Sequence, residues 1–118
     1  MPTRPHELVA AAKALSKLDG EVFRRAAVHQ AYYGVYHLAC EALGLDPVNR
    51  YAEAKHRDVI DAVEKAPPGS ARLHRMKRYM RKLKRLRAVA DYDLASPLTD
   101  LQARNAVEMA ESIITAPL

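Results

Sequence analysis

Residues Glu21 to Leu43 read EVFRRAAVHQAYYGVYHLACEAL, and this stretch decides the fold because it is apolar on two helical faces. One face carries Val22, Ala26, His29, Tyr33, Tyr36, Cys40 and Leu43, and the other carries Val28, Tyr32, Val35, Ala39 and Ala42. A helix that is apolar on two faces is typical of the buried centre of a bundle. We therefore expect the remaining helices to pack around this segment.

Four further helices are predicted from apolar spacing and from turn signals. They are expected at about Pro5–Leu18, Ala52–Lys65, Ser70–Asp91 and from Thr99 to the end of the chain. Thr3 and Ser70 are the expected N-caps of the first and fourth segments, and Thr99 with Gln102 reads as a capping box. No strand-like alternation stands out. The sequence predicts an all-α, up-and-down bundle of about five helices that forms one domain over residues 1–118.

The composition is that of a globular domain, since 49% of the 118 residues are apolar and 28% are charged. No apolar run approaches the roughly 20 residues of a membrane span. Glu7, Lys13 and Lys17 interrupt the alanine-rich start, which is unlike a signal peptide. Cys40 is the single cysteine, so an intrachain disulfide is excluded. These features predict a cytoplasmic protein with no membrane partner.

The positive charge is concentrated in one segment. Nine Lys or Arg and no acid lie between Arg72 and Arg87, whereas the rest of the chain has ten bases and fourteen acids. Such a run is either an electrostatic footprint for RNA or another polyanion, or a solvated helix face. Tyr79 within it would either stack on a base or pack in the core. The candidate contacts to nucleic acid or nucleotide in this run are Arg78, Arg81, Lys84 and Arg85.

Arg87 differs from the other bases because it falls on the apolar seam of its helix. The seam also contains Leu73, Met76, Met80, Leu83 and Ala90. A guanidinium in that position is costly unless it finds anionic or hydrogen-bonding partners. Asp91, one turn later, is a ready partner. Arg87 therefore either closes a structural ion pair or belongs to a functional site.

A polar stripe runs along the central segment. Gln30, Tyr33, His37 and Glu41 are three and four residues apart and share one face. His37 is either an ordinary packed histidine or an acid–base group, because its reference pKa is near neutrality. Cys40 sits on a packed seam, which suits a small core residue better than a nucleophile. The histidines form no metal-binding motif, so we expect neither a metal ion nor a cofactor.

Three segments also recur in the order and spacing of a known family pattern. They are AYYGVYH at residues 31–37, KHRDVI at residues 55–60 and LRAVADYD at residues 86–93. Together they resemble the HEPN-domain family, in particular its small stand-alone proteins, whose patterns read AYYAxFH, KTHxGVI and LRxxADYD. The resemblance implies an up-and-down helical bundle that forms a homodimer.

The resemblance also implies a set of functions. Many HEPN proteins are metal-independent ribonucleases with an arginine followed four to six residues later by histidine, near the dimer interface. Many are toxins that a nucleotidyltransferase-like antitoxin neutralises, and others bind nucleotides or RNA without cutting. The resemblance therefore implies a homodimer that binds nucleotide or RNA, and pairing with such an antitoxin is one of the roles it implies. Ribonuclease activity and a protein-interaction role are alternatives.

Carried onto this chain, the family motif places its arginine at Arg87, but Tyr92 stands where the histidine belongs and no histidine follows. In the usual mechanism an imidazole takes the proton of a ribose 2′-hydroxyl while arginine stabilises phosphate charge. A tyrosine, with a reference pKa near ~10, is a poor base at neutral pH. The expected site is thus Arg87 with Tyr92 and His37, bordered by Tyr33 and Asp91.

Overall fold

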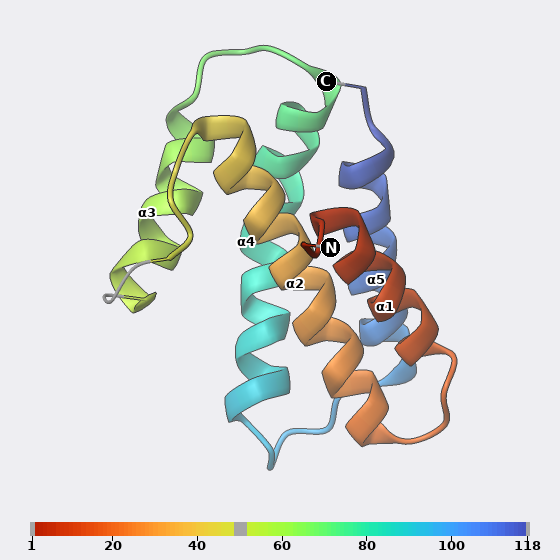
Figure 1. The fold of residues 1–118 in the computed structure, drawn as a ribbon. Helices are drawn as coiled ribbons and strands as arrows, with labels where there is room; N and C mark the ends of the chain where they lie inside the picture. The colour runs from red at the N-terminus through yellow and green to blue at the C-terminus, as the bar shows by residue number, and fades with distance from the viewer. Residues whose placement is uncertain (1, 49–51, 118) are drawn as a thin grey trace.

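The computed structural model describes residues 2–48 and 52–117, with side chains in the second range from residue 56 onward. Within these ranges the chain forms helices and no strand, which confirms the predicted all-α bundle (Figure 1). The helices are α1 (Pro5–Ser16), α2 (Glu21–Leu43), α3 (Ala52–Lys65), α4 (Ala71–Tyr92) and α5 (Asp100–Thr115). None of them is both long and apolar enough to cross a membrane.

The central position predicted for Glu21–Leu43 is confirmed, because α2 packs against all four other helices. Helices α1, α4 and α5 surround it, whereas α3 lies on the flank and contacts only α2 and α4 (Figure 1). Consecutive helices run in opposite directions except α2 and α3, which rise toward the same end (Figure 1). The predicted up-and-down arrangement therefore holds for α1–α2, α3–α4 and α4–α5, but not for α2–α3.

The core is built mainly from small and branched aliphatic side chains, and Phe23 stays partly exposed. Small residues let the helices approach closely, most of all at Gly34 in α2. A Cβ atom at Gly34 would lie 2.6 Å from Val9 Cγ2 and 3.2 Å from the Pro5 carbonyl oxygen of α1. Glycine is needed here because the backbone of α1 crosses directly over this position.

The helix ends follow most of the predicted capping signals. Ser70 Oγ accepts a hydrogen bond from Leu73 N at 3.1 Å, and the capping box between Thr99 and Gln102 is present. The expectation that Thr3 caps the first helix is wrong, since the N-cap is Arg4 and α1 ends at Ser16. The physical reason is Pro5: the residue before a proline is held extended, and proline itself is favoured in the first turn.

Two arginines of α2 fix the connection between α4 and α5. Arg24 Nε donates to the Leu98 carbonyl oxygen at 2.9 Å. The Arg25 guanidinium donates to the carbonyl oxygens of Val89, Ala90, Asp93, Leu94 and Ser96. Arg25 also pairs with Glu21 at 2.6 Å, which lowers the pKa of that carboxyl. The last turn of α4 is thereby anchored against α2.

We predict that Gly34→Ala destabilises the bundle by about 1–3 kcal/mol. The added methyl group collides with Val9 and with backbone of α1, which outweighs the usual gain of alanine in a helix. The measurement is urea unfolding followed by circular dichroism. Gly69→Ala is the matched control, because its Cβ would lie 3.7 Å from the nearest atom.

A second substitution, Val9→Ala, tests whether the collision with Val9 causes the loss of stability. Val9→Ala removes the closest clashing atom, so adding it to Gly34→Ala should cost less than its effect in the wild-type background. Additive losses from the two substitutions would show that the contact between α1 and α2 is not the reason.

Candidate functional site

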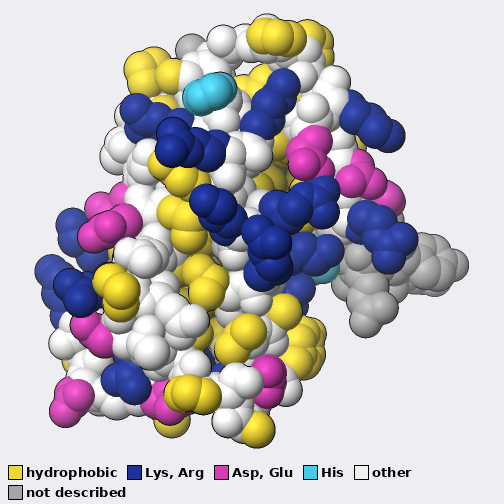
Figure 2. Space-filling view, turned by 180° about the vertical axis from the view of Figure 1, so that it is seen from behind, with side chains coloured by type: hydrophobic (Ala, Val, Ile, Leu, Met, Phe, Trp, Pro, Cys, Tyr) yellow, Lys and Arg dark blue, Asp and Glu magenta, His cyan; other side chains and the backbone are white. Residues whose placement is uncertain are grey.

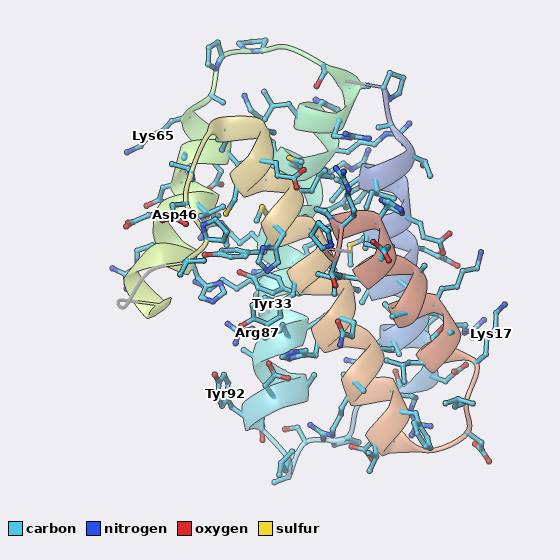
Figure 3. The ribbon with its side chains drawn as sticks, viewed as in Figure 1. Lys17, Tyr33, Asp46, Lys65, Arg87 and Tyr92 are labelled. Carbon is cyan, nitrogen blue, oxygen red and sulfur yellow. The ribbon has the colours of Figure 1, made fainter. Side chains whose placement is uncertain are left out.

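Arg87 of α4 lies among tyrosine rings. Its guanidinium carbon is 5.2 Å from the centroid of Tyr32, 5.8 Å from Tyr33 and 5.5 Å from Tyr92. The side chain is only 9% exposed, and aromatic faces stabilise a cation that has lost its water. Figure 3 shows Tyr33, Arg87 and Tyr92 along one flank of the bundle. The helix seam therefore directs Arg87 inward, as its spacing predicts.

The Arg87 guanidinium is poorly paired for so buried a cation. Its Nη1 lies 3.6 Å from Asp91 Oδ2 and 3.5 Å from Tyr92 Oη, which are long contacts for a charged donor. Its Nε is buried and has no hydrogen-bond partner among the described residues. The predicted pairing with Asp91 is confirmed, but a guanidinium has five N–H donors, and among the described residues only Nη1 has a partner.

A histidine–carboxylate pair lies beside this cation. Nδ1 of His29, in α2, is 3.0 and 2.9 Å from the two carboxylate oxygens of Asp91. Asp91 therefore contacts both His29 and Arg87. The His29 ring packs 4.7 Å from the Tyr33 ring, and 43% of its side chain is exposed. Arg87, His29 and Asp91 thus form one connected unit across α2 and α4.

The Asp91 contact also decides which nitrogen of His29 is free. A carboxylate accepts hydrogen bonds, so Nδ1 carries the proton and a neutral His29 ring presents Nε2 as an acceptor. A carboxylate that orients an imidazole in this way is a common arrangement for proton transfer. A neutral His29 could therefore accept a proton at Nε2.

A second histidine contacts the hydroxyl groups of two of these tyrosines. His56 of α3 has Nδ1 at 2.8 Å from Tyr32 Oη and Nε2 at 3.5 Å from Tyr33 Oη. Its ring lies 4.5 Å from that of Tyr36. Burial, and then the positive charge of Arg87, lower the pKa of His56. His56 is consequently a neutral hydrogen-bonding partner at pH 7, and it adds no charge beside Arg87.

The tyrosines are neutral as well. Burial raises the pKa of Tyr32 and of Tyr33, although the charge of Arg87 opposes the change in both. Burial, followed by the influence of Cys40, raises the pKa of Tyr36 to about 12. These phenols therefore do not supply a counter-charge to Arg87, and Asp91 is its carboxylate partner.

His37 makes no contact with Arg87 among the described residues. It borders a separate hollow of about 410 Å³, together with Leu8, Cys40 and Glu41. Its ring packs 5.5 Å from that of Tyr36. Of the residues expected at the site, Tyr33, Asp91 and Tyr92 gather around Arg87. His29, which lies on the α2 seam that the sequence predicts to be packed, contacts Asp91 at this site.

The basic run divides into structural and unpaired members. Several of its cations hold the carboxyl ends of neighbouring helices, where carbonyl oxygens lack helical partners. Arg72 donates to Ile113 and Ile114, Arg75 to Ser112, and Lys77 to Ala66, while Arg81 forms an ion pair with Glu64. Arg81 is thus already paired with an acid, although the sequence favours it as a phosphate contact.

The other predicted phosphate contacts lie on different sides of α4. Lys84 lies three residues before Arg87 and so on the same side of α4. Its charge also contributes to the lowered pKa of His56. Arg85 borders a groove between α4 and α5 instead. Arg78 lies over the ring of Tyr79, at 5.3 Å from its centroid. The basic run is therefore not one continuous surface, and Lys84 alone of these residues belongs with Arg87.

No metal-binding group of three or more His, Cys, Asp or Glu occurs in the part of the chain that the structure describes. No protein-family model, curated protein or solved structure matches this chain. The resemblance to HEPN proteins therefore rests on the three segments quoted above. In the second of them the side chain of Lys55 lies outside the described residues, whereas His56 contacts the tyrosine group.

Proposed function

We propose that this protein is a HEPN-type domain of the cytoplasm that binds RNA or a nucleotide at Arg87. The observation that carries the proposal is the poor pairing of a nearly buried guanidinium, whose described contacts are 3.5 and 3.6 Å long. Phosphate oxygens are strong acceptors for guanidinium donors. A bound phosphate would supply acceptors that Arg87 lacks among the described residues.

The surroundings of Arg87 suit a nucleotide in two further respects. The Arg87 guanidinium lies 5.5 Å from the centroid of the Tyr92 ring, but Tyr92 is 77% exposed, so the exposed part of its ring could stack on a base. Lys84 adds a second positive charge on the same side of α4. Lys84, Arg87 and Tyr92 all lie on α4, so the helix fixes their relative positions.

A second candidate function is metal-independent ribonuclease activity, and the His29–Asp91 pair favours it. In this reaction His29 Nε2 would take the proton of a ribose 2′-hydroxyl, and the 2′ oxygen would attack the adjacent phosphorus. The bond from phosphorus to the 5′ oxygen would break, with the leaving oxygen protonated by water. The products would be a 2′,3′-cyclic phosphate end and a 5′-hydroxyl end, while Arg87 stabilises the added negative charge.

In this account His29 replaces the histidine that the family motif carries after its arginine. Tyr92 occupies that motif position, and it serves to contact Arg87 rather than to act as base. Asp91 keeps His29 in the tautomer that the reaction needs. A role of the chain in protein interaction only, without an RNA site, would leave the poor pairing of Arg87 unexplained.

We predict that the protein cleaves a single-stranded oligoribonucleotide in EDTA at neutral pH, and that His29→Ala lowers the rate about 100- to 10,000-fold. His74→Ala is the matched control, because His74 is an exposed histidine at the other end of α4. Gel analysis should detect cyclic-phosphate ends. Circular dichroism of each variant checks that the bundle is folded.

Binding is measured separately, so that the two functions can be told apart. Fluorescence anisotropy with a 2′-deoxy version of the oligonucleotide should show affinity that falls with salt and with Arg87→Ala. Binding without cleavage would retain the first function and reject the second. The absence of binding at low salt would reject both functions.

The HEPN resemblance also implies a homodimer, and we propose one through the end of the bundle where the α1–α2 and α4–α5 connections meet (Figure 1). Large exposed apolar side chains gather in these segments: Leu18, Val22, Phe23, Leu94 and Leu101. A surface of this kind is typical of an interaction site. A nucleotidyltransferase-like antitoxin remains the partner protein that the resemblance implies.

We predict that the protein is a dimer at micromolar concentration in multi-angle light scattering, and that Val22→Asp produces a monomer. Val48→Asp should leave the dimer intact, because Val48 is equally exposed but lies beyond the other end of α2. A wild-type monomer, or dissociation by both substitutions, would contradict this interface.

A further inference from the structure

Helices α4 and α5 enclose a groove that shares no residue with the Arg87 site. Its volume is about 630 Å³. Tyr79, Leu86 and Met109 provide its apolar surface, and all three are partly buried against the core. Lys82 and Arg85 form the rim on α4. Figure 2 views the face opposite to that of Figure 1 and shows Lys and Arg gathered near its middle, beside exposed apolar side chains.

The two rim cations on α4 and the nearby Arg78 form no ion pair among the described residues. Arg78, Lys82 and Arg85 follow one another at steps of four and three residues, so they form a stripe along one side of the helix. In the described part of the chain none of the three has a hydrogen bond or an ion pair. Their neighbours Arg75 and Arg81, by contrast, bind Ser112 and Glu64.

We propose that this groove binds an amphipathic helix of a partner protein, with acidic side chains along the α4 rim. Apolar side chains on one face of such a helix would pack on Leu86 and Met109, in the mode of helix-in-groove recognition. The acidic side chains would pair with Lys82 and Arg85, and opposite charge would also speed and orient the encounter. This inference does not depend on the RNA site at Arg87.

The groove suits a peptide better than RNA for three reasons. Its floor is apolar, whereas a nucleic-acid backbone needs polar and positive contacts along its length. Glu108 stands on the α5 side and would repel phosphate groups. The guanidinium of Arg78 lies 5.3 Å from the centroid of the Tyr79 ring, over the face on which a base would stack.

The probe is a fluorescein-labelled, helix-forming peptide of about 15 residues. It carries Leu at three- and four-residue steps and Glu on the flanking positions. Anisotropy with the full-length protein should show saturable binding, which the double variant K82E/R85E weakens at least ~10-fold. Lys17→Glu is the control, because it reverses the charge of an exposed lysine that does not line the groove (Figure 3).

A charge-reversed peptide, with Lys in place of each Glu, provides the sharpest comparison. It should bind wild-type protein poorly and should gain affinity for K82E/R85E. The proposal is overturned if the acidic peptide does not bind. It is also overturned if K82E/R85E binds it as wild type does, or if the double variant abolishes oligoribonucleotide binding and leaves peptide binding unchanged.

Discussion

The positive charge of Arg87, enclosed by the tyrosines of α2, is the constraint on which the arrangement of this bundle's functional side depends. A buried guanidinium is stabilised by aromatic faces and a carboxylate, which α2 and α4 provide here. Tyr32 and Tyr33 of α2 supply ring faces, Asp91 of α4 supplies the charge, and His56 of α3 holds the tyrosine hydroxyls. The site therefore joins α3, the most peripheral helix, to the central pair α2 and α4.

The anchoring of the end of α4 explains why Asp91 has two partners. Arg25 of α2 binds the carbonyl oxygens at the end of α4, which fixes the last turn of α4 against α2. In that position Asp91 reaches Arg87 on its own helix and His29 on α2. One carboxylate thus stabilises a cation and orients an imidazole, two roles that phosphodiester chemistry combines.

Much of the fold could be predicted from local signals. The two apolar faces of α2 predict its central place, and the caps at Ser70 and Thr99 mark helix starts because capping depends on residues within one turn. Arg87 could be singled out for a similar reason, since a charge on an apolar seam needs no tertiary information to be recognised. Asp91 could be predicted as a partner of Arg87 because it lies one helical turn after it.

The remaining features depend on contacts between distant segments. His29 and Asp91 are 62 residues apart in sequence, and no local pattern indicates that they pair. The structural use of Arg72, Arg75 and Lys77 could not be predicted either, because their acceptors are carbonyl oxygens on other helices. His37, on the same helix as His29, was favoured for its place on the polar stripe, and the contact with Asp91 is what brings His29 into consideration.

The central claim is that Asp91 holds His29 with Nδ1 protonated and Nε2 free beside Arg87. Nitrogen–proton correlation spectra of the histidine side chains, recorded above neutral pH, report this tautomer directly. The account predicts the Nδ1–H form for His29 in the wild type and a shift toward Nε2–H in Asp91→Asn, with His29 signals that move when a 3′-nucleotide is added. An Nε2–H form in the wild type that is indifferent to both changes would contradict it.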